Sequence, residues 1–501
     1  AIWDGRQNLL FAARDRFGKK PFVYHQSQNA LVFGSAIRTV MKDPAISTDP
    51  NFRAIDAYLT RQYVPSPETA FMGVKKLPAA HYLVSDQQGR LSTQRYWSPP
   101  AATPSSTDYQ ETKTELRRKL TESVRARLIA DVPLGALLSG GIDSGLVVAL
   151  MAETSERPVK TFSIGFEEDS HNELPYARQV ADRFSTDHTE YVVKPNVQDL
   201  LPRLVREYNE PFADSSAIPS FYVAQVARQH VTVALTGDGG DESFAGYAHY
   251  RLAEQWGRLD AIPLAIRQAL LSPLIWSAGF APYNNFGSKL SRGLRLLAAD
   301  WPARYLENTA FFKAEESQAC YTPRFRSLIT DSREAFEMDS PGYLNSSNPI
   351  DWMMQYDQNH YLPDCLMVKA DVASMANSLE LRSPFLDHQL VEFAATIPLV
   401  FKRDGSSGKR ILRDLAREVL PPDIVNKPKT GFSIPLAHWL RSDLAEYMRD
   451  LLMDETALKR RLFKKEFVEQ MAREHSQNIR DWSSRLWAMM WLELWFREFI
   501  D

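Results

Sequence analysis

The chain has 501 residues, of which 44% are hydrophobic and 24% charged, and its formal net charge at pH 7 is −3. This length and composition indicate a globular protein with more than one domain. The balanced charge excludes the strongly basic surface of a typical nucleic-acid-binding protein, and no apolar stretch is long enough for a membrane span. Because no signal peptide opens the chain and Cys320 and Cys365 are its only cysteines, we expect a reduced, cytoplasmic protein. We expect small-molecule substrates as partners, and neither nucleic acid nor a membrane. A homodimer is the oligomer that we consider.

The first hundred residues favour antiparallel strands. Apolar runs at 9–13, 21–24 and 30–33 alternate with polar turns, and residues 81–86 and 92–97 form two further predicted strands. The chain opens in a predicted strand without an initiator Met, so we expect it to lack an N-terminal part. The Pro- and Ser-rich stretch 98–108 is the predicted boundary between a first domain, residues 1–100, and a second, residues 109–501.

Strands and helices alternate from Tyr109 onward. Predicted strands at 134–138, 158–166, 188–193 and 231–237 are separated by predicted helices, which indicates a doubly wound parallel sheet, an α/β fold. Residues 248–400 are predicted to be mostly helical, and the stretch 366–387 to begin as a helix and end in a proline turn. Four tryptophans at helical spacing near the C-terminus are interpreted as core: Trp482, Trp487, Trp491 and Trp495.

The loop SGGIDS at 139–144 joins a predicted buried strand to a predicted helix. Such a loop offers backbone N–H groups and hydroxyls to an anion at the start of a helix. Asp143 would repel a phosphate unless a divalent cation lay between them, and Mg²⁺ prefers oxygen ligands of this kind. A glycine pair alone is more often a plain turn, but the strand, the helix and the aspartate together favour a phosphate site. The residues that would hold the phosphate are Ser139, Gly140, Gly141, Asp143 and Ser144.

A second polar loop, TGDGGDESFAGY at 236–247, also follows a predicted parallel strand. Ligands of such sheets bind beyond the carboxyl ends of the strands. Neighbouring carboxylates repel one another unless they share a cation or a proton. We therefore expect Asp241 to bind the metal together with Asp143, and Asp238 to face the acceptor substrate. A solvated Asp-Gly turn is the alternative.

Two lysines near the C-terminal end are candidate catalytic residues. Lys409 precedes a predicted amphipathic helix, and Lys429 lies in a loop with proline, threonine and glycine. A reaction at a bound phosphate group develops negative charge on its leaving group, which a lysine point charge can stabilise. Taken singly, either lysine is more simply a solvated surface residue.

The motifs together resemble one family. SGGIDS is similar to the pyrophosphate loop of the N-type ATP pyrophosphatases, and the whole set resembles the glutamine-hydrolysing asparagine synthetases of the bacterial AsnB type. RDRFGKKPFVY and KKLPAAHYL resemble the end of that family's glutaminase domain. The stretches similar to its synthetase domain are DVPLGALLSGGIDS, FSIGF, EPFADSSAIP, LTGDGGDESFAGY, SLELRSPFLD and KPKTGFSIPLAHWL.

The resemblance implies an ATP pyrophosphatase domain, similar to the adenine nucleotide alpha hydrolases, with a helical C-terminal part. The antiparallel remnant of an Ntn-type glutaminase domain would precede it. The implied cofactors are ATP and Mg²⁺, with Asp143 and Asp241 as metal ligands and Lys409 and Lys429 near the phosphates or the adenylate. The residues implied to line the AMP moiety are Leu137, Ile164, Thr236 and Gly237. The implied reaction adenylates a carboxylate, which in this family is aspartate, and transfers ammonia from glutamine to give asparagine, AMP and pyrophosphate.

The chain departs from the family pattern in ways that keep other acceptors open. The family's N-terminal cysteine nucleophile lies outside this sequence, so glutamine hydrolysis is not expected of the chain as given, although free ammonia could serve. The segment EPFADSSAIP has no arginine to hold a second carboxylate. The alternatives are amidation of another acid, such as a polysaccharide uronic acid or a cell-wall precursor, and a β-lactam-forming cyclase. A non-catalytic nucleotide-binding protein is a further alternative.

Overall fold

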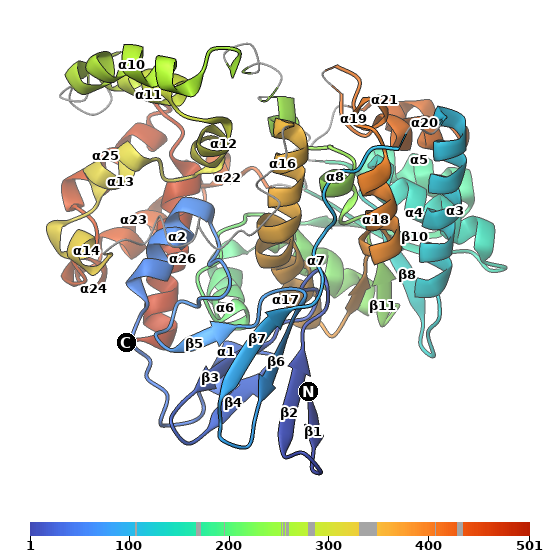
Figure 1. Cartoon of the computed structure of the whole chain (residues 1–501), viewed down its shortest axis with the longest axis horizontal. Helices are drawn as coiled ribbons and strands as arrows, with labels where there is room; N and C mark the ends of the chain where they lie inside the picture. Colours follow the sequence, from blue (N-terminus) through green and yellow to red (C-terminus); the bar gives the residue numbers. More distant parts are fainter. Residues whose placement is uncertain are drawn as a thin grey trace.

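The computed structural model describes residues 1–105, 108–166, 172–194, 196–251, 253, 256, 260–278, 286–329, 348–405, 407–427 and 434–501. Figure 1 shows the antiparallel strands at the lower end, the parallel sheet with its helices on the right, and helices of the C-terminal half on the left and at the top.

Two antiparallel sheets form the first part of the chain. One has the order β1 (Ile2–Asp4), β2 (Leu9–Ala13), β6 (His81–Ser85) and β7 (Leu91–Arg95). The other has the order β4 (Leu31–Gly34), β3 (Val23–Gln26) and β5 (Val74–Lys76). The connections contain α1 (Ile37–Val40) and α2 (Phe52–Arg61). The predicted antiparallel character of this part is confirmed.

A five-stranded parallel sheet is the framework of the second part. Its order is β10 (Asp187–Val193), β9 (Lys160–Phe166), β8 (Leu134–Leu137), β11 (Val233–Leu235) and β12 (Glu380–Arg382). The helices that precede or connect β8 to β11 are α3 (Tyr109–Arg127), α4 (Ile142–Thr154), α5 (Leu174–Phe184), α6 (Val197–Tyr208) and α7 (Ala217–Arg228). The chain runs from β8 outward to β10 and then returns to β11 on the other side of β8. The carboxyl ends of β8 and β11 therefore border the crevice where such sheets bind ligands.

The strand β12 was not predicted from the sequence. The helical start expected in 366–387 is present as α17 (Met367–Met375), but Glu380–Arg382 then pairs in parallel with β11. Three residues are too few to show an alternating pattern, and tertiary pairing decides their conformation. The side chains of Glu380 and Arg382 form an ion pair of 2.7 Å.

The rest of the described chain is helical. Between β11 and β12 lie α8 (Gly240–Ser243), η2 (Ala248–Tyr250), α10 (Leu264–Ala278), α11 (Phe286–Ala298), α12 (Trp301–Thr309), α13 (Ala314–Cys320), α14 (Pro323–Leu328), α16 (Pro349–Tyr356), the π-helix η4 (Asp357–Leu366) and α17. After β12 come η5 (Pro384–Leu386), α18 (His388–Thr396), α19 (Leu399–Lys402), α20 (Arg410–Val419), α21 (Pro422–Asn426), α22 (Leu436–Trp439), α23 (Ala445–Met453), α24 (Glu455–Lys459), α25 (Lys465–Ser476) and α26 (Ser483–Phe499).

The C-terminal helix α26 lies in the centre of the largest hydrophobic cluster. The four tryptophans predicted to be core are fully buried: Trp482, Trp487, Trp491 and Trp495. The hydroxyl of Tyr58, on α2, donates a 2.7 Å hydrogen bond to the carbonyl of Ala488. Figure 1 shows α2 beside α26, so the first and last parts of the sequence share this cluster.

Ion pairs also join the antiparallel part to the parallel-sheet part. Lys76 of β5 forms a buried ion pair with Glu210, in the loop after α6. Lys20 contacts Asp371 of α17 at 2.6 Å. These contacts attach the first hundred residues to segments that border the crevice of the parallel sheet.

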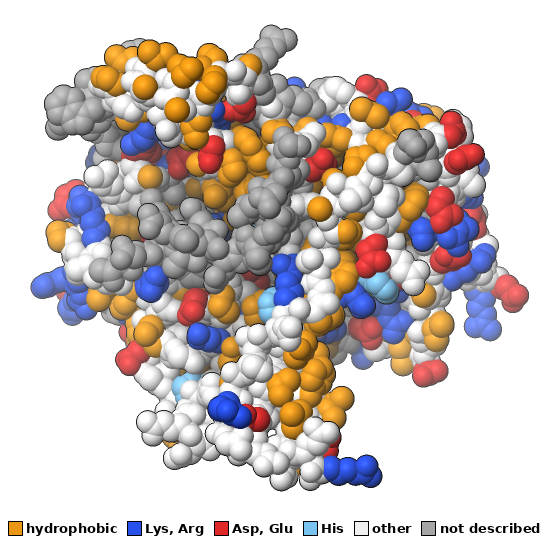
Figure 2. Space-filling view, viewed as in Figure 1, with side chains coloured by type: hydrophobic (Ala, Val, Ile, Leu, Met, Phe, Trp, Pro, Cys, Tyr) orange, Lys and Arg blue, Asp and Glu red, His pale blue; other side chains and the backbone are white. Residues whose placement is uncertain are grey.

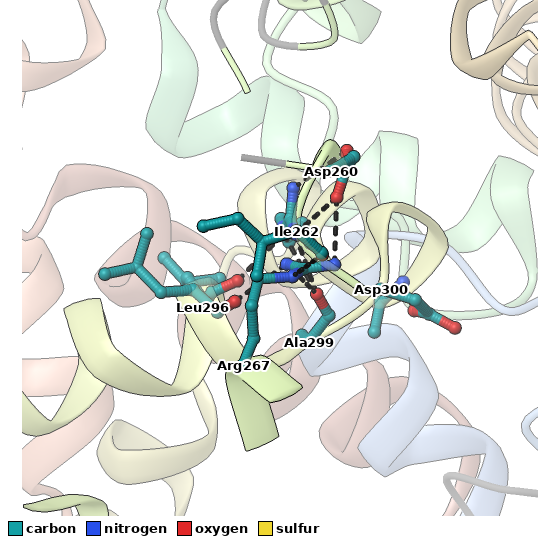
Figure 3. Close-up of polar contacts among 9 residues, drawn as sticks. Asp260, Ile262, Arg267, Leu296, Ala299 and Asp300 are labelled. Carbon is teal, nitrogen blue, oxygen red and sulfur yellow. Dashed lines mark hydrogen bonds and ion pairs between the residues drawn. The ribbon is translucent and has the colours of Figure 1, made fainter. Parts of the chain in front are cut away.

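The helical pair α10 and α11 stands at the top of the molecule in Figure 1. Its base is fixed by Asp260, which contacts Arg267 at 3.0 Å and Arg304 at 2.7 Å (Figure 3). Exposed apolar side chains, Ile266, Leu270 and Leu274, follow one another at four-residue spacing on α10, and Figure 2 shows this apolar surface at the top left. Among the described residues, no helix has both the length and the apolar character needed to cross a membrane.

Candidate active site

A cavity of about 500 Å³ lies at the carboxyl ends of β8, β9 and β11. The residues expected at the AMP moiety all line it: Leu137, Ile164, Thr236 and Gly237. So do most residues of the predicted phosphate and metal site: Ser139, Gly141, Asp143, Ser144, Asp238, Asp241 and Lys409. Residues from four separate stretches of the chain are thus brought into one crevice.

The loop after β8 leads directly into α4, whose N-cap is Gly141. The backbone N–H of Ser139 donates to the hydroxyl of Ser144 at 3.3 Å, and the two hydroxyls lie 3.1 Å apart. The first backbone N–H groups of α4 lack partners within the helix, which makes this terminus suited to an anion.

Gly140 does not line the cavity. Its φ is +68°, and a Cβ there would lie 2.7 Å from the backbone nitrogen of Ala177 in α5. The glycine is therefore required by the turn and by the packing of the loop against α5. Its contribution to a phosphate site is to the shape of the loop.

The carboxylates of Asp143 and Asp241 converge on one cation. The ammonium of Lys409 forms an ion pair with Asp143 and lies 2.8 Å from Asp241 Oδ1. Although burial favours the neutral amine, the charges of the two aspartates raise the pKa of Lys409. Two carboxylates that converge on one point are also the kind of oxygen ligands that a divalent cation such as Mg²⁺ prefers.

No group of three or more His, Cys, Asp or Glu side chains that could hold a metal occurs among the described residues. The protein would therefore offer Mg²⁺ two carboxylates, with substrate phosphates and water completing its octahedral shell. This is the usual arrangement at nucleotide sites. The donor set fits Mg²⁺ in that form.

Glycines give Lys409 its position. Lys409 has a φ of +58°, at the start of α20, and the preceding Gly408 packs against the carbonyl of Ala245, where a Cβ would lie 2.0 Å away. A Cβ on Gly246 would lie 2.1 Å from Asp241 Oδ1 and 2.3 Å from Lys409 Cε. The small residues thus allow the backbone of one loop to approach the ion-paired groups of another.

Two further carboxyl groups of the second loop have different surroundings. Asp238 Oδ2 accepts a 2.8 Å hydrogen bond from the hydroxyl of Thr236. Glu242 is buried and accepts a hydrogen bond from the Tyr247 hydroxyl. Burial, together with the charge of Asp241, raises the pKa of Glu242 to about 8. Asp238 and Glu242 both line the cavity, and Glu242 also supports the loop through its contact with Tyr247.

Residues 115–497 match the family model of asparagine synthase, and residues 1–97 match that of a glutamine amidotransferase domain. The chain belongs to the asparagine synthase family. The match covers both the parallel sheet with its loops and the helical C-terminal part, so the fold predicted from the sequence is confirmed.

Named relatives are similar over nearly the whole chain. Asparagine synthetase [glutamine-hydrolyzing] 1 of Bacillus subtilis is 30% identical over 99% of this chain and 76% of its own length. A putative asparagine synthetase [glutamine-hydrolyzing] of Mycobacterium tuberculosis H37Rv is 33% identical over 100% of this chain and 76% of its own. The amidase chyE of Penicillium rubens is 26% identical over 91% of this chain and 72% of its own.

Three cationic side chains of the cavity were not singled out from the sequence: Lys369, Arg413 and Lys427. Lys427 contacts Glu173 at 2.5 Å, and its ammonium lies 4.4 Å from the ring centre of Tyr176. Arg413 lies one turn into α20; burial lowers its pKa, and the charge of Asp143 acts in the opposite direction. The helical periodicity that places Arg413 on the same side as Lys409 is the signal that could have found it. Lys429, a predicted catalytic residue, lies outside the described residues.

Proposed function

We propose that this member of the asparagine synthase family is an ATP-dependent amidotransferase. It adenylates a carboxylate, for which aspartate is the acid we favour, and transfers ammonia from glutamine to give the amide, AMP and pyrophosphate. The observation that carries the proposal is the convergence of Asp143 and Asp241 on one cation beside the N-terminus of α4. The names of the relatives and the match of residues 1–97 to an amidotransferase domain support asparagine as product and glutamine as donor.

In the first step, an oxygen of the acceptor carboxylate attacks the α-phosphorus of ATP and the bond to the bridging oxygen of pyrophosphate breaks. The loop 139–144 and the N-terminus of α4 would hold the leaving pyrophosphate. The ammonium of Lys409 would then stabilise the negative charge that develops on the pyrophosphate, and Lys429 would have a similar role. Asp143 and Asp241 would hold Mg²⁺, which supplies charge neutralisation on the phosphates.

In the second step, ammonia attacks the acyl carbon, the bond to AMP breaks, and one proton leaves the nitrogen. Asp238 faces the cavity and is positioned as a candidate acceptor for that proton. The cavity walls would protect the acyl-adenylate from water. We further propose residues 1–100 as the remnant of the glutaminase domain and 109–501 as the synthetase domain. The two buried free thiols support a cytoplasmic location.

The experiment is pyrophosphate exchange into ATP, measured with a panel of acids, followed by amide formation with ammonium chloride as donor. Using ammonium makes the result independent of glutamine hydrolysis. We expect exchange with L-aspartate that requires Mg²⁺, and one AMP for each asparagine formed. Exchange with a uronic acid and none with aspartate would show a different acceptor, whereas turnover without ammonia would indicate a cyclase.

A further inference from the structure

The outer face of α10 is apolar, although the helix belongs to an exposed hairpin. Ile266, Leu270 and Leu274 are 50%, 67% and 52% exposed, and their four-residue spacing places them on one side of the helix. Ile262, just before the helix, and Leu290 of the neighbouring helix α11 are each 46% exposed. Single exposed apolar side chains are common on proteins, whereas a row of them marks a contact surface.

A second side of α10 is also apolar and packs on the protein. Leu264, Leu271 and Ile275 are half-buried, and the helix lies against α11. Arg267, the one charged residue of α10, is buried and contacts Asp260. A helix at the surface of a globular protein usually has a polar outer face, and one that is apolar all round is usually buried. The outer face of α10 therefore has the character of a face that is covered.

The hairpin also has a one-sided charge. Residues 261–299 contain no Asp or Glu, although the whole chain has 62 of them. The basic residues of this stretch are Arg267, Lys289, Arg292 and Arg295. Arg267 and Arg295 form ion pairs with Asp260 and Glu315, which lie outside the stretch. The other two basic residues, both in α11, give the hairpin an excess of positive charge.

The chemistry of this surface suits a bilayer better than a protein partner. Among the described side chains of α10, the exposed ones that carry polar groups are Gln268 and Ser272, and the Ser272 hydroxyl already donates to the carbonyl of Gln268 at 2.5 Å. A protein interface needs about one hydrogen bond per 100–200 Å², whereas acyl chains need none. A second copy of the chain would bring the same positive charge to the contact, which disfavours self-association through this face.

We propose that the hairpin of α10 and α11 docks on an anionic membrane surface. The row Ile266, Leu270 and Leu274 enters the boundary between headgroups and acyl chains, and the basic residues of α11 attract the anionic headgroups. The hairpin stands at one end of the molecule, with its apolar surface at the top of Figure 2, so it can meet a flat surface.

This docking needs no membrane span, and in the part of the chain that the structure describes no helix could form one. The inference departs from the expectation, drawn from the sequence, that a membrane is not a partner of this protein. It goes beyond the proposed function and does not depend on it.

The test is flotation of the full chain with vesicles of phosphatidylcholine alone and of equal parts phosphatidylcholine and phosphatidylglycerol. We expect about 10- to 30-fold tighter binding to the anionic vesicles, because each of two basic residues contributes about fivefold near such a surface. Raising the salt from about 0.1 M to about 0.5 M should remove most of this preference. Hydrogen–deuterium exchange of the wild type with anionic vesicles should slow in residues 262–298 and stay unchanged in the antiparallel strands.

Leu270→Glu/Leu274→Glu tests the apolar row. The two side chains are exposed, so the substitutions disturb no core packing, and binding to anionic vesicles should fall at least about 100-fold. Ile129→Glu/Ile479→Glu is the matched control, since it places the same two charges at exposed apolar positions elsewhere on the protein. The control should bind within about threefold of the wild type. Equal losses in the two variants, or unchanged binding in Leu270→Glu/Leu274→Glu, would overturn the proposal.

Lys289→Gln/Arg292→Gln tests the charge separately. Affinity for anionic vesicles should fall about 10-fold, and affinity for neutral vesicles should not change. Together with hydrogen exchange on the wild type, this variant decides the question if Leu270→Glu/Leu274→Glu fails to fold. A wild type without preference for anionic vesicles would overturn the proposal, as would a dimer, measured by light scattering, that Leu270→Glu/Leu274→Glu dissociates.

Pyrophosphate exchange separates this inference from the proposed function. We expect the same exchange rate in the wild type and in all three variants without vesicles, because the substituted residues are absent from the lining of the cavity. Loss of vesicle binding with full exchange would therefore leave the proposed function intact. Vesicle binding without any exchange would leave the docking surface intact.

Discussion

Asp143 and Asp241 contact the same ammonium group, that of Lys409, although Asp143 lies in the first turn of α4 and Asp241 in α8. Two carboxylates this close repel one another unless they share a cation. The site therefore favours positive charge at this point.

Replacing Asp241 with Asn should reduce pyrophosphate exchange at least about 100-fold, because one of two carboxylates available to Mg²⁺ is lost. The measurement is the exchange rate as a function of Mg²⁺ concentration. Asp423→Asn, an exposed position in α21, is the matched control and should leave the rate unchanged. An Asp241→Asn protein with wild-type exchange would contradict the assignment of the metal site.

Replacing Lys409 with Gln should make the protein more responsive to Mg²⁺ in the absence of nucleotide. The two aspartates lose their shared ammonium, at a cost on the order of 3 kcal/mol, and a divalent cation can take its place. Thermal unfolding with increasing Mg²⁺ measures this, and the Lys427→Gln protein should respond as the wild type does. Equal responses of Lys409→Gln and wild type would show that Mg²⁺ does not bind between these carboxylates.

Gly246→Ala should abolish exchange with little change in the rest of the fold. The added Cβ would lie within 2.3 Å of both Asp241 Oδ1 and Lys409 Cε, so the ion-paired groups have to move. Gly293→Ala, in the helix α11, meets nothing within 4 Å and serves as the control. We expect the control to keep its activity and to gain up to about 1 kcal/mol from helix propensity. Full exchange activity in Gly246→Ala would argue against a catalytic need for this geometry.

His360 in the π-helix η4 should make the fold sensitive to acid. Burial, with Arg61 and Arg95 nearby, lowers the pKa of His360 to about 3. An unfolded chain therefore binds a proton below pH 6.5 that the folded chain does not, and stability present above pH 6.5 is lost as the pH falls toward 3. Between pH 7 and pH 5, the free energy of unfolding should fall by up to about 2 kcal/mol less in His360→Asn than in the wild type. Denaturant unfolding at the two values checks this, and equal losses in both proteins would contradict it.

The sequence predicted the elements that carry a local pattern. The parallel strands before SGGIDS and TGDGGDES were recognisable because apolar runs are followed by glycine and aspartate. The buried face of α26 was recognisable because its tryptophans recur at helical spacing. In each case the signal lies within a few neighbouring residues.

What the sequence could not predict depends on contacts between distant segments. The strand β12 forms because Glu380–Arg382 pairs in parallel with β11. Lys369 contacts Asp214, which lies 155 residues earlier in the chain. The segment 210–219 has no arginine of its own, and the cation that contacts Asp214 comes from α17. Lys409 was identified as a phosphate ligand, but its contact with both aspartates follows only from the packing of the loop around Gly246.

The contacts of Lys76 with Glu210 and of Lys20 with Asp371 bear on how this chain can be divided. A cut within the predicted boundary 98–108 would leave those carboxylates without their counter-charges and would expose the surface of α26 that Tyr58 contacts. The two parts are therefore not interchangeable modules: an exchange of either part with that of a relative has to bring matching lysines and a matching apolar face with it.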